Sequence, residues 1–339
     1  MAEKGSYEAA GVSIERGERA TGLMRSAVEN THGPEVIGGP GGFAGLYALA
    51  GYDAPVLAST IDGVGTKVLV AKELGRYDSL GADIVNHCAN DVLATGASPL
   101  FFLDYIGSGQ LDPEAVAGIV RGAADACGRL GVSLIGGETA EMPGLYGRGD
   151  FEIVGVCLGA CERSEVVGGE RVRPGDAVLG LASSGLHTNG YTLARKVLED
   201  AGISYSERAE GLDLPVGEAL LESHRAYVRE IEALRKSVEV RGMAHVTGGG
   251  LVGNLPRALG GLGARLDEGS WEEPAVFGLI RSLGDVPEDE MRKVFNLGVG
   301  FCAVVSPEEA EPGLEALCGA GCEAWKIGVV THGGGVVFA

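Results

Sequence analysis

The stretch STIDGVGTKVLVA, residues 59–71, places one acid, two glycines and one lysine in a turn between two apolar segments. The apolar segment PVLAST is typical of a buried strand, and this strand is expected to end at Asp62. The glycines and Lys67 give the turn the look of a phosphate loop. It is not a Walker motif, because a single valine separates the two glycines and another valine follows the lysine. Any phosphate must therefore be handled by a different arrangement of residues.

Length, composition and charge narrow the class of protein. The chain has 339 residues, enough for two domains, and its 58 glycines with only 6% aromatic residues suit an α/β fold with many tight strand-to-helix turns. The formal charge of −20 argues against binding to nucleic acid or to an anionic membrane, since both require a basic surface. Either the acidity serves solubility, or an anionic ligand is bound through a divalent cation.

The cysteines and the N-terminus predict a soluble, cytoplasmic protein. The seven cysteines are an odd number, form no zinc-like CxxC pairs and mostly lie in apolar segments. Buried free thiols in a reducing compartment fit this pattern better than disulfides or metal ligands. The first residues, MAEKGSYEAAGVS, contain no apolar signal-peptide core, and no segment approaches the length of a membrane span.

The order of segments predicts two α/β domains. Residues 1–50 have little regular pattern and many glycines, and we interpret them as an extended arm plus a mobile glycine-rich loop. Residues 51–168 alternate strands and helices, and residues 169–339 repeat the scheme after a boundary at two glycines. In the first domain, the segment VGVCLGA is apolar on both faces, which indicates a central strand. In the second domain, one long helix is expected over 216–236.

The expected helix GADIVNHCANDVLATG, residues 81–96, has a polar stripe of unusual composition. At about 100° per residue, Asp83, His87, Asn90 and Asp91 share one face of this helix. One interpretation is the solvated face of an ordinary amphipathic helix. The stripe contains no lysine or arginine, however, and a face of carboxylates and amides suits Mg²⁺. The sequence leaves both interpretations open.

Three carboxylates come from three different elements of the first domain. Asp62 ends one expected strand, Glu138 follows the strand VSLIGG, and Asp91 lies on the helix between them. Acids at the carboxyl ends of strands lie where α/β sheets build their ligand crevices. Together with Lys67, such a set suits a triphosphate that is neutralised by Mg²⁺. Taken alone, Glu138 is equally well explained as a turn residue.

Two loops of the second domain are candidates for holding an anion or a polar small molecule. The segment LASSGLHTNGYTLAR presents Ser184, His187 and Asn189 between a strand and a helix. The segment HVTGGGLVG places residues 247–250 before another helix, where bare backbone amides favour phosphate. Close backbone packing explains these glycines equally well, and His245 before them is interpreted as a buried supporting histidine.

Seven segments, taken in order, resemble the phosphoribosylformylglycinamidine cyclo-ligases, the aminoimidazole ribonucleotide synthetases of purine biosynthesis. The segments are DGVGTK (62–67), NDVLATGASPLFFLDY (90–105), GGETAEMPG (136–144), SSGLHTNGY (183–191), HVTGGG (245–250), FNLGVG (295–300) and AWKIG (324–328). The similarity covers nearly the whole chain from the mid-30s onward. Two departures are Ile61, where the family often has threonine, and His87, where it often has methionine.

The resemblance implies a fold and a reaction. The implied fold has an N-terminal α/β domain whose sheet pairs with its mate across a homodimer, and a C-terminal α/β domain with a mixed sheet and flanking helices. The implied reaction is the ATP-dependent closure of formylglycinamidine ribonucleotide to aminoimidazole ribonucleotide, with release of ADP and phosphate. The alternatives are a related thiamine-monophosphate kinase or selenophosphate synthetase, or a non-catalytic nucleotide-binding homologue. Such a homologue usually lacks acids of the metal set, and none is missing here.

The resemblance also assigns roles to individual residues. Mg²⁺ on the triphosphate is expected to be held by Asp62, Asp91 and Glu138. Lys67 is expected to stabilise charge on the transferring group, while His187 and Asn189 position substrate or move a proton. The other nucleotide contacts are expected from Gly41, Gly42, Gly63, Gly65, Thr66 and Asn90. The residues expected to bind the substrate and its ribose phosphate are Ser184, Thr247, Gly248, Gly249 and Gly250.

Overall fold

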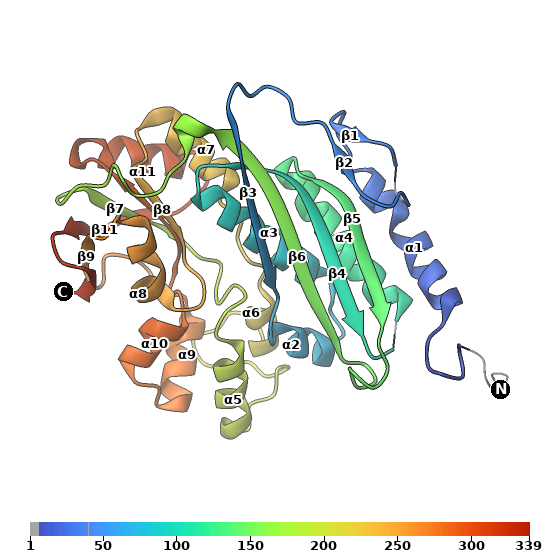
Figure 1. Cartoon of the computed structure of the whole chain (residues 1–339). Helices are drawn as coiled ribbons and strands as arrows, with labels where there is room; N and C mark the ends of the chain where they lie inside the picture. Colours follow the sequence, from blue (N-terminus) through green and yellow to red (C-terminus); the bar gives the residue numbers. More distant parts are fainter. Residues whose placement is uncertain (1–6, 40, 111) are drawn as a thin grey trace.

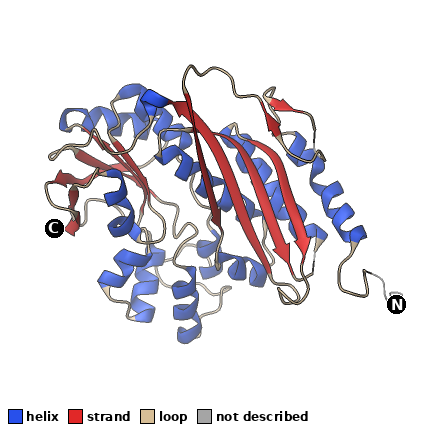
Figure 2. Ribbon diagram, in the orientation of Figure 1, coloured by secondary structure: helices blue, strands red, loops and turns tan. Residues whose placement is uncertain are grey.

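The structure is a computed structural model that describes residues 7–39, 41–110 and 112–339. Two large β-sheets, each built from one half of the chain, lie beside each other with helices packed around them, and a separate two-stranded sheet lies near the N-terminus (Figures 1 and 2). The predicted α/β class is confirmed. The expected boundary at 168/169 falls in the segment that joins the last strand of the first sheet to the first strand of the second. Within the described ranges, no helix has the length and apolar character needed to cross a membrane.

The first sheet has the strand order β3-β6-β4-β5. The elements of this half are α1 (Ile14–Glu29), β1 (Val36–Ile37), β2 (Leu46–Tyr47), β3 (Pro55–Gly63), α2 (Lys67–Leu74), α3 (Asp78–Ala94), β4 (Ser98–Ser108), α4 (Pro113–Leu130), β5 (Ser133–Glu141), β6 (Phe151–Glu162) and the short helix η1 (Arg163–Glu165). β6 is antiparallel to both of its neighbours and β4 is parallel to β5, so β3, β4 and β5 end at the same edge. The segment VGVCLGA lies in β6, and its predicted central position is confirmed.

One face of this sheet is covered and the other is open. Phe102, Ile153 and Cys157 are buried on the face that packs against α3 and α4. On the opposite face, Leu57 and Ile61 of β3 are 61% and 67% exposed. Figure 1 views the sheet from this open side. The open face is therefore a surface with large apolar side chains in contact with solvent.

The N-terminal arm is not extended as predicted, because residues 14–29 form helix α1. Ala20 and Met24, four residues apart, turn the apolar side of the helix toward the first core. The start of the helix is fixed by Glu141 of β5, which accepts a hydrogen bond from the backbone N–H of Ser13 at 2.6 Å. The apolar spacing was present in the sequence, but the stripe is narrow and the glycine-rich context obscured it.

The second sheet has the strand order β12-β9-β11-β7-β10-β8 and is antiparallel except between β12 and β9. The elements of this half are β7 (Ala177–Ala182), α5 (Tyr191–Ala201), α6 (Val216–Leu221), α7 (Val228–Ser237), β8 (Gly242–His245), α8 (Gly250–Asn254), η2 (Leu255–Ala258), β9 (Gly263–Leu266), α9 (Ala275–Gly284), α10 (Glu288–Val294), β10 (Val299–Val305), η3 (Pro307–Glu309), α11 (Ala310–Gly319), β11 (Ala324–Thr331) and β12 (Gly335–Phe338). Helices α7 and α11 cover one face, and α8 with η2 covers the other.

The prediction of one helix over 216–236 is wrong, because residues 222–227 separate α6 from α7. Polar side chains of α3 hold this separating segment. Asp83 accepts a hydrogen bond from one of its backbone N–H groups at 2.7 Å, and Asn86 and Asn90 donate to two of its carbonyls at 2.6 and 2.8 Å. These bonds satisfy backbone groups that a helix would otherwise have paired. A contact between distant parts of the chain therefore interrupts the helix.

Candidate active site at the domain junction

The polar stripe of α3 faces the second domain rather than solvent. Asp83 and Asn90 are fully buried, and His87 is 2% exposed. Asp91 lies at the rim of the junction, where 30% of its side chain is accessible. The interpretation of this stripe as an ordinary solvated face is therefore wrong. Asn90 is also committed to the junction, since it accepts from Tyr227 N at 3.0 Å and its amide donates to a backbone carbonyl.

Lys67 lies in the same junction but does not face a cavity. Its ammonium group is fully buried, lies 2.9 and 2.8 Å from the two carboxylate oxygens of Asp83, and donates to the carbonyls of His187 and Glu222 at 3.2 and 2.8 Å. Burial raises the pKa of Asp83, although the lysine charge opposes the shift. A lysine has three donors, and all three are used here to join the domains. The expected contact between Lys67 and a transferring phosphoryl group is therefore not available in this conformation.

Asp62, at the end of β3, and Asp91 lie beside two histidines. His87 Nε2 is 2.9 Å from Asp62 Oδ2 and 3.9 Å from Asp91 Oδ2, while His245 Nδ1 is 2.8 Å from Asp91 Oδ1. Burial disfavours ionisation of both aspartates, but their attraction to these histidines outweighs it. The pKa of Asp62 and the pKa of Asp91 are lowered as a result. Both carboxylates are therefore ionised at neutral pH.

Two further histidines extend this cluster into the core. His224 Nε2 is 2.9 Å from His245 Nε2, and the His224 ring stacks on His187 with 4.0 Å between ring centroids. Burial, reinforced by neighbouring positive groups, lowers the pKa of His187 and the pKa of His224 well below the ordinary value, so both rings are neutral. His187 has φ 63°, in the left-handed region that disfavours residues with a side chain. Because it is 1% exposed, His187 supports its loop from the inside.

The two candidate substrate loops lie next to each other. A Cβ atom at Gly248 would be 3.2 Å from Asn189 Oδ1, so the loops meet at these residues. Ser184 Oγ donates to the carbonyl of Ser223 at 2.6 Å, which ties the first loop to the segment between α6 and α7. Asn189 is half-buried and is the more accessible of the two residues to which we gave a role in cyclisation.

Close packing explains part of the glycine content of the second loop, residues 247–250. A Cβ atom at Gly250 would lie 2.1 Å from the carbonyl oxygen of Arg292, and Gly249 has φ 102°. Thr247 Oγ1 donates to Asn254 Oδ1 at 3.3 Å. Close packing therefore requires glycine at position 250, whatever the loop binds.

The turn that carries the opening motif joins β3 to α2. The backbone N–H of Gly63 donates to Asp62 Oδ1 at 2.7 Å, and Gly65 has φ 66°. Thr66 Oγ1 is 3.0 Å from Thr192 Oγ1 of α5. The turn thus fixes one carboxylate oxygen of Asp62 and contacts the second domain.

A cavity of about 320 Å³ opens beside Asp91 and His245. Thr60, whose hydroxyl donates to Asp91 Oδ2 at 3.1 Å, lines it as well. Arg257 contributes a positive charge to the wall. The cavity therefore combines an ionised carboxylate, an imidazole and a guanidinium group, which is a suitable set for a phosphorylated ligand with a cation.

Glu138 does not join the two aspartates. With Gly41 and Gly42 it lines a different cavity, of about 620 Å³, between α1, the glycine-rich loop and the strands β4 and β5. The strand order puts β6 and β4 between β3 and β5, so three strand spacings, roughly 14 Å, separate Asp62 from the row of Glu138. A single cation held by Asp62, Asp91 and Glu138 of one chain is therefore a wrong prediction. Glu138 also lies within β5 and not in a turn after it.

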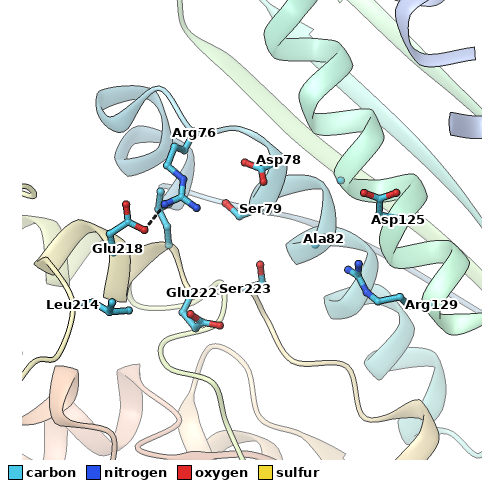
Figure 3. Close-up of a pocket in the computed structure, with 12 residues that line it drawn as sticks. Arg76, Asp78, Ser79, Ala82, Asp125, Arg129, Leu214, Glu218, Glu222 and Ser223 are labelled. Carbon is cyan, nitrogen blue, oxygen red and sulfur yellow. Dashed lines mark hydrogen bonds and ion pairs between the residues drawn. The ribbon is translucent and has the colours of Figure 1, made fainter.

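Another cavity, of about 260 Å³, lies between α3, α4 and α6 (Figure 3). Arg76 and Glu218 form an ion pair at one side of it, and Glu222 and Ser223 line its wall. None of the residues singled out in the sequence lines this cavity. Its mixed charges belong to the contact between the domains.

Sequence reasoning missed several polar residues of the junction and of these cavities. His224 was hidden because its segment was assigned to a helix. Arg257 carries no motif of its own. Asp104 had a usable signal, since it is a lone acid in the apolar strand PLFFLDYI. It lines the 620 Å³ cavity, and burial raises its pKa to about 7.

Comparison with known proteins defines the class. Residues 44–161 match the family described as AIR synthase related protein, N-terminal domain, and residues 173–339 match the corresponding C-terminal domain. A thiamine-monophosphate kinase from Stenotrophomonas maltophilia has a similar fold, with a TM-score of 0.71 at 17% identity over 94% of this chain and 95% of that chain. The hydrogenase maturation protein HypE in complex with ATP also has a similar fold, with a TM-score of 0.66 at 19% identity over 93% of this chain and 86% of that chain. The chain is thus an AIR synthase related protein.

Curated relatives identify the family within this class. The phosphoribosylformylglycinamidine cyclo-ligase of Geobacillus kaustophilus is 48% identical over 98% of both chains. The protein of the same name from Sorangium cellulosum is 49% identical over 98% of this chain and 97% of its own. The chain belongs to the phosphoribosylformylglycinamidine cyclo-ligase family and is a ligase, which confirms the resemblance seen in the sequence.

Proposed function

We propose that this ligase uses ATP to close the imidazole ring of formylglycinamidine ribonucleotide, releasing aminoimidazole ribonucleotide, ADP and phosphate. The observation that supports the proposal best is the pair of ionised, partly accessible carboxylates of Asp62 and Asp91 at the junction. Phosphoryl transfer depends on positioning and on neutralisation of charge, and needs no protein nucleophile. A junction with fixed acids, Arg257 and two neighbouring loops suits that task.

The reaction converts an amide oxygen into a leaving group. Transfer of the γ-phosphoryl group to the formyl oxygen breaks the bond to ADP, and loss of the proton on the formamide nitrogen gives an imidate phosphate. The ribosylated amidine nitrogen of the substrate then attacks the formyl carbon, a proton leaves that nitrogen, and the oxygen departs with phosphate. Asn189 and Ser184, with residues 247–250 opposite, orient the substrate for this attack. His187 acts through the loop that it supports.

Asp62 and Asp91 are the residues that would hold a divalent cation. Their ionised oxygens suit a hard dication, and the hydrogen bonds from Gly63 N to Asp62 and from Thr60 to Asp91 orient them. When bound, the cation would neutralise charge on the triphosphate. Gly65 and Thr66 complete the turn beside Asp62.

We further propose that the enzyme is a homodimer formed through the open face of the first sheet. Exposed Leu57 and Ile61 on that face support this arrangement, because large apolar patches on a soluble protein mark interaction surfaces. In such a dimer, Glu138, Gly41 and Gly42 would contact the nucleotide from the 620 Å³ cavity. The seven free cysteines support a reducing, cytoplasmic location.

Substitution of Asp91 tests the proposal. Asp91→Asn should lower ATP turnover with formylglycinamidine ribonucleotide by about 10³-fold, because the neutral amide no longer holds the cation. ADP release is measured with each acceptor, and circular dichroism checks the fold. Asp200→Asn, an exposed aspartate on α5, is the control and should match the wild type. Wild-type turnover in Asp91→Asn would remove the metal assignment, and turnover only with thiamine monophosphate would remove the ring-closing reaction.

A further inference from the structure

Four side chains at the junction present nitrogen and oxygen donors to one small region. The ligand atoms of His87, Asp91 and His245 all lie within 4.8 Å of one another, and Asp62 Oδ2 is 2.9 Å from His87 Nε2. Ligand atoms about 2.0–2.2 Å from one metal ion lie about 3 Å apart when they are neighbours in its coordination shell. The distances of 2.8 Å from His245 Nδ1 to Asp91 Oδ1 and of 2.9 Å from His87 Nε2 to Asp62 Oδ2 are close to that spacing. His87 Nε2 is 3.9 Å from the other carboxylate oxygen of Asp91. Small side-chain adjustments would therefore bring the four donors around one ion.

We propose that Asp62, His87, Asp91 and His245 form a mixed nitrogen–oxygen site that prefers a transition-metal dication such as Mn²⁺, Co²⁺ or Zn²⁺ to Mg²⁺. The proposal deepens the proposed function and rests on it for the role of the two aspartates. It adds the two imidazoles as ligands. Imidazole nitrogen suits first-row transition metals, whereas Mg²⁺ strongly favours oxygen.

Each proposed ligand is already oriented by a partner behind it. His87 Nδ1 is 2.7 Å from Thr188 Oγ1, and His245 Nε2 is 2.9 Å from His224 Nε2, which leaves His87 Nε2 and His245 Nδ1 toward the site. Asp62 Oδ1 and Asp91 Oδ2 accept hydrogen bonds from Gly63 N and Thr60 Oγ1. Metal sites in proteins are built in this way, with a hydrogen-bonding group behind each ligand to fix its orientation.

Charge and access also favour a metal. Two carboxylates and two neutral imidazoles around a dication give a complex without net charge, which reduces the cost of placing the ion in a half-buried site. His87 Nε2 is buried and makes no hydrogen bond of normal geometry, although Asp62 is close. The 320 Å³ cavity beside Asp91 and His245 provides the entry path. The competing explanation is that the two histidines pair only with the two aspartates and no metal enters.

Metal binding is measured on the full chain without nucleotide or substrate, so the result does not depend on the reaction. The chain is stripped with a chelator and titrated with Mn²⁺, whose free ion is followed by electron paramagnetic resonance, and Mg²⁺ is then added as competitor. We expect one Mn²⁺ per chain. Pulsed electron paramagnetic resonance should show hyperfine coupling between the bound Mn²⁺ and imidazole nitrogen. A site made of carboxylates alone lacks this coupling.

The variants separate ligands from supporting residues. His87→Leu should lower the preference for Mn²⁺ over Mg²⁺ by about tenfold or more, should change Mg²⁺ affinity little, and should reduce the nitrogen coupling. Asp62→Asn should weaken the binding of both Mn²⁺ and Mg²⁺. It provides a second variant if His87→Leu does not fold. His332→Gln, at an exposed histidine, is the matched control and should bind as the wild type does.

Three results would overturn the proposal. One is no stoichiometric Mn²⁺ binding. Another is Mn²⁺ bound without nitrogen coupling. The third is an unchanged preference in a folded His87→Leu variant. Loss of ring closure with metal binding intact would instead count against the proposed function alone.

Discussion

The two sheets of this molecule are covered to different extents. All seven residues of β10 in the second sheet are buried, because α7 and α11 pack on one face and α8 with η2 on the other. In β3 of the first sheet, exposed residues alternate with partly buried ones. The second sheet is therefore a complete core, whereas the first has an apolar face that a partner can cover. The polar junction lies on the covered side of the first sheet, where α3 meets the second domain.

The difference between the two sheets shows what each half of the chain contributes to the junction. The second sheet provides a fully packed frame that positions the loops carrying Asn189 and Gly248. The first sheet provides Asp62, and its helix α3 provides Asp91. The functional groups are concentrated where the two frames touch, so the stability of that contact should control activity.

The largest expected effect comes from the contact itself. Lys67→Met should destabilise the protein by about 3–5 kcal/mol, because it leaves the Asp83 carboxylate buried without its partner. Denaturant unfolding measures the loss. The double variant Lys67→Met/Asp83→Leu removes both charges and should recover a large part of the stability. A Lys67→Met protein with wild-type stability and no turnover would instead restore the catalytic role expected from the sequence.

On the covered side of the first sheet, Asp104 should make stability depend on pH. Its carboxyl ionises near 3.8 when unfolded and near 7 when folded, so the folded state retains the proton longer. Stability should therefore fall as pH rises from about 4 to about 7 and then level off. At about 1.4 kcal/mol per pKa unit, the loss in free energy of unfolding across this range is at most about 4 kcal/mol. Urea unfolding across this range should show the slope in the wild type and not in Asp104→Asn.

A control in the other sheet sharpens this prediction. Asp267→Asn, at an aspartate that follows β9 and whose side chain is 48% exposed, should keep the wild-type slope. An equal slope in wild type and Asp104→Asn would show that the Asp104 carboxyl is not kept protonated by its surroundings.

A charged substitution on the open face of the first sheet tests whether this face forms the proposed dimer interface. Ile61→Asp should weaken the proposed dimer by about 10–100-fold, since it buries an unpaired carboxylate in the interface. Sedimentation velocity over a concentration series measures the change. Val337→Asp, on an exposed position of β12 in the second sheet, should leave the oligomeric state as in the wild type. A wild-type protein that is monomeric at micromolar concentration would refute the proposed pairing.

The sequence predicted those features that depend on neighbouring residues. The helical period correctly grouped Asp83, His87, Asn90 and Asp91 on one face of α3. The features it could not predict depend on long-range contacts. The strand order separates Glu138 from Asp62, hydrogen bonds from α3 interrupt the helix expected over 216–236, and Lys67 turns to Asp83. None of these contacts has a local pattern.

Thiol reactivity, the smallest effect, compares the two sheets directly. Cys157 in β6 and Cys302 in β10 are buried, and burial raises the pKa of each to about 12, so neither forms a reactive thiolate in the folded state. Cys318 on α11 is exposed and should react alone with a thiol reagent. Cys318→Ser should abolish the fast phase and change stability by less than about 0.5 kcal/mol. If mass spectrometry finds Cys157 modified before Cys302 in native buffer, the first sheet opens more readily than the second, as its uncovered face would lead one to expect.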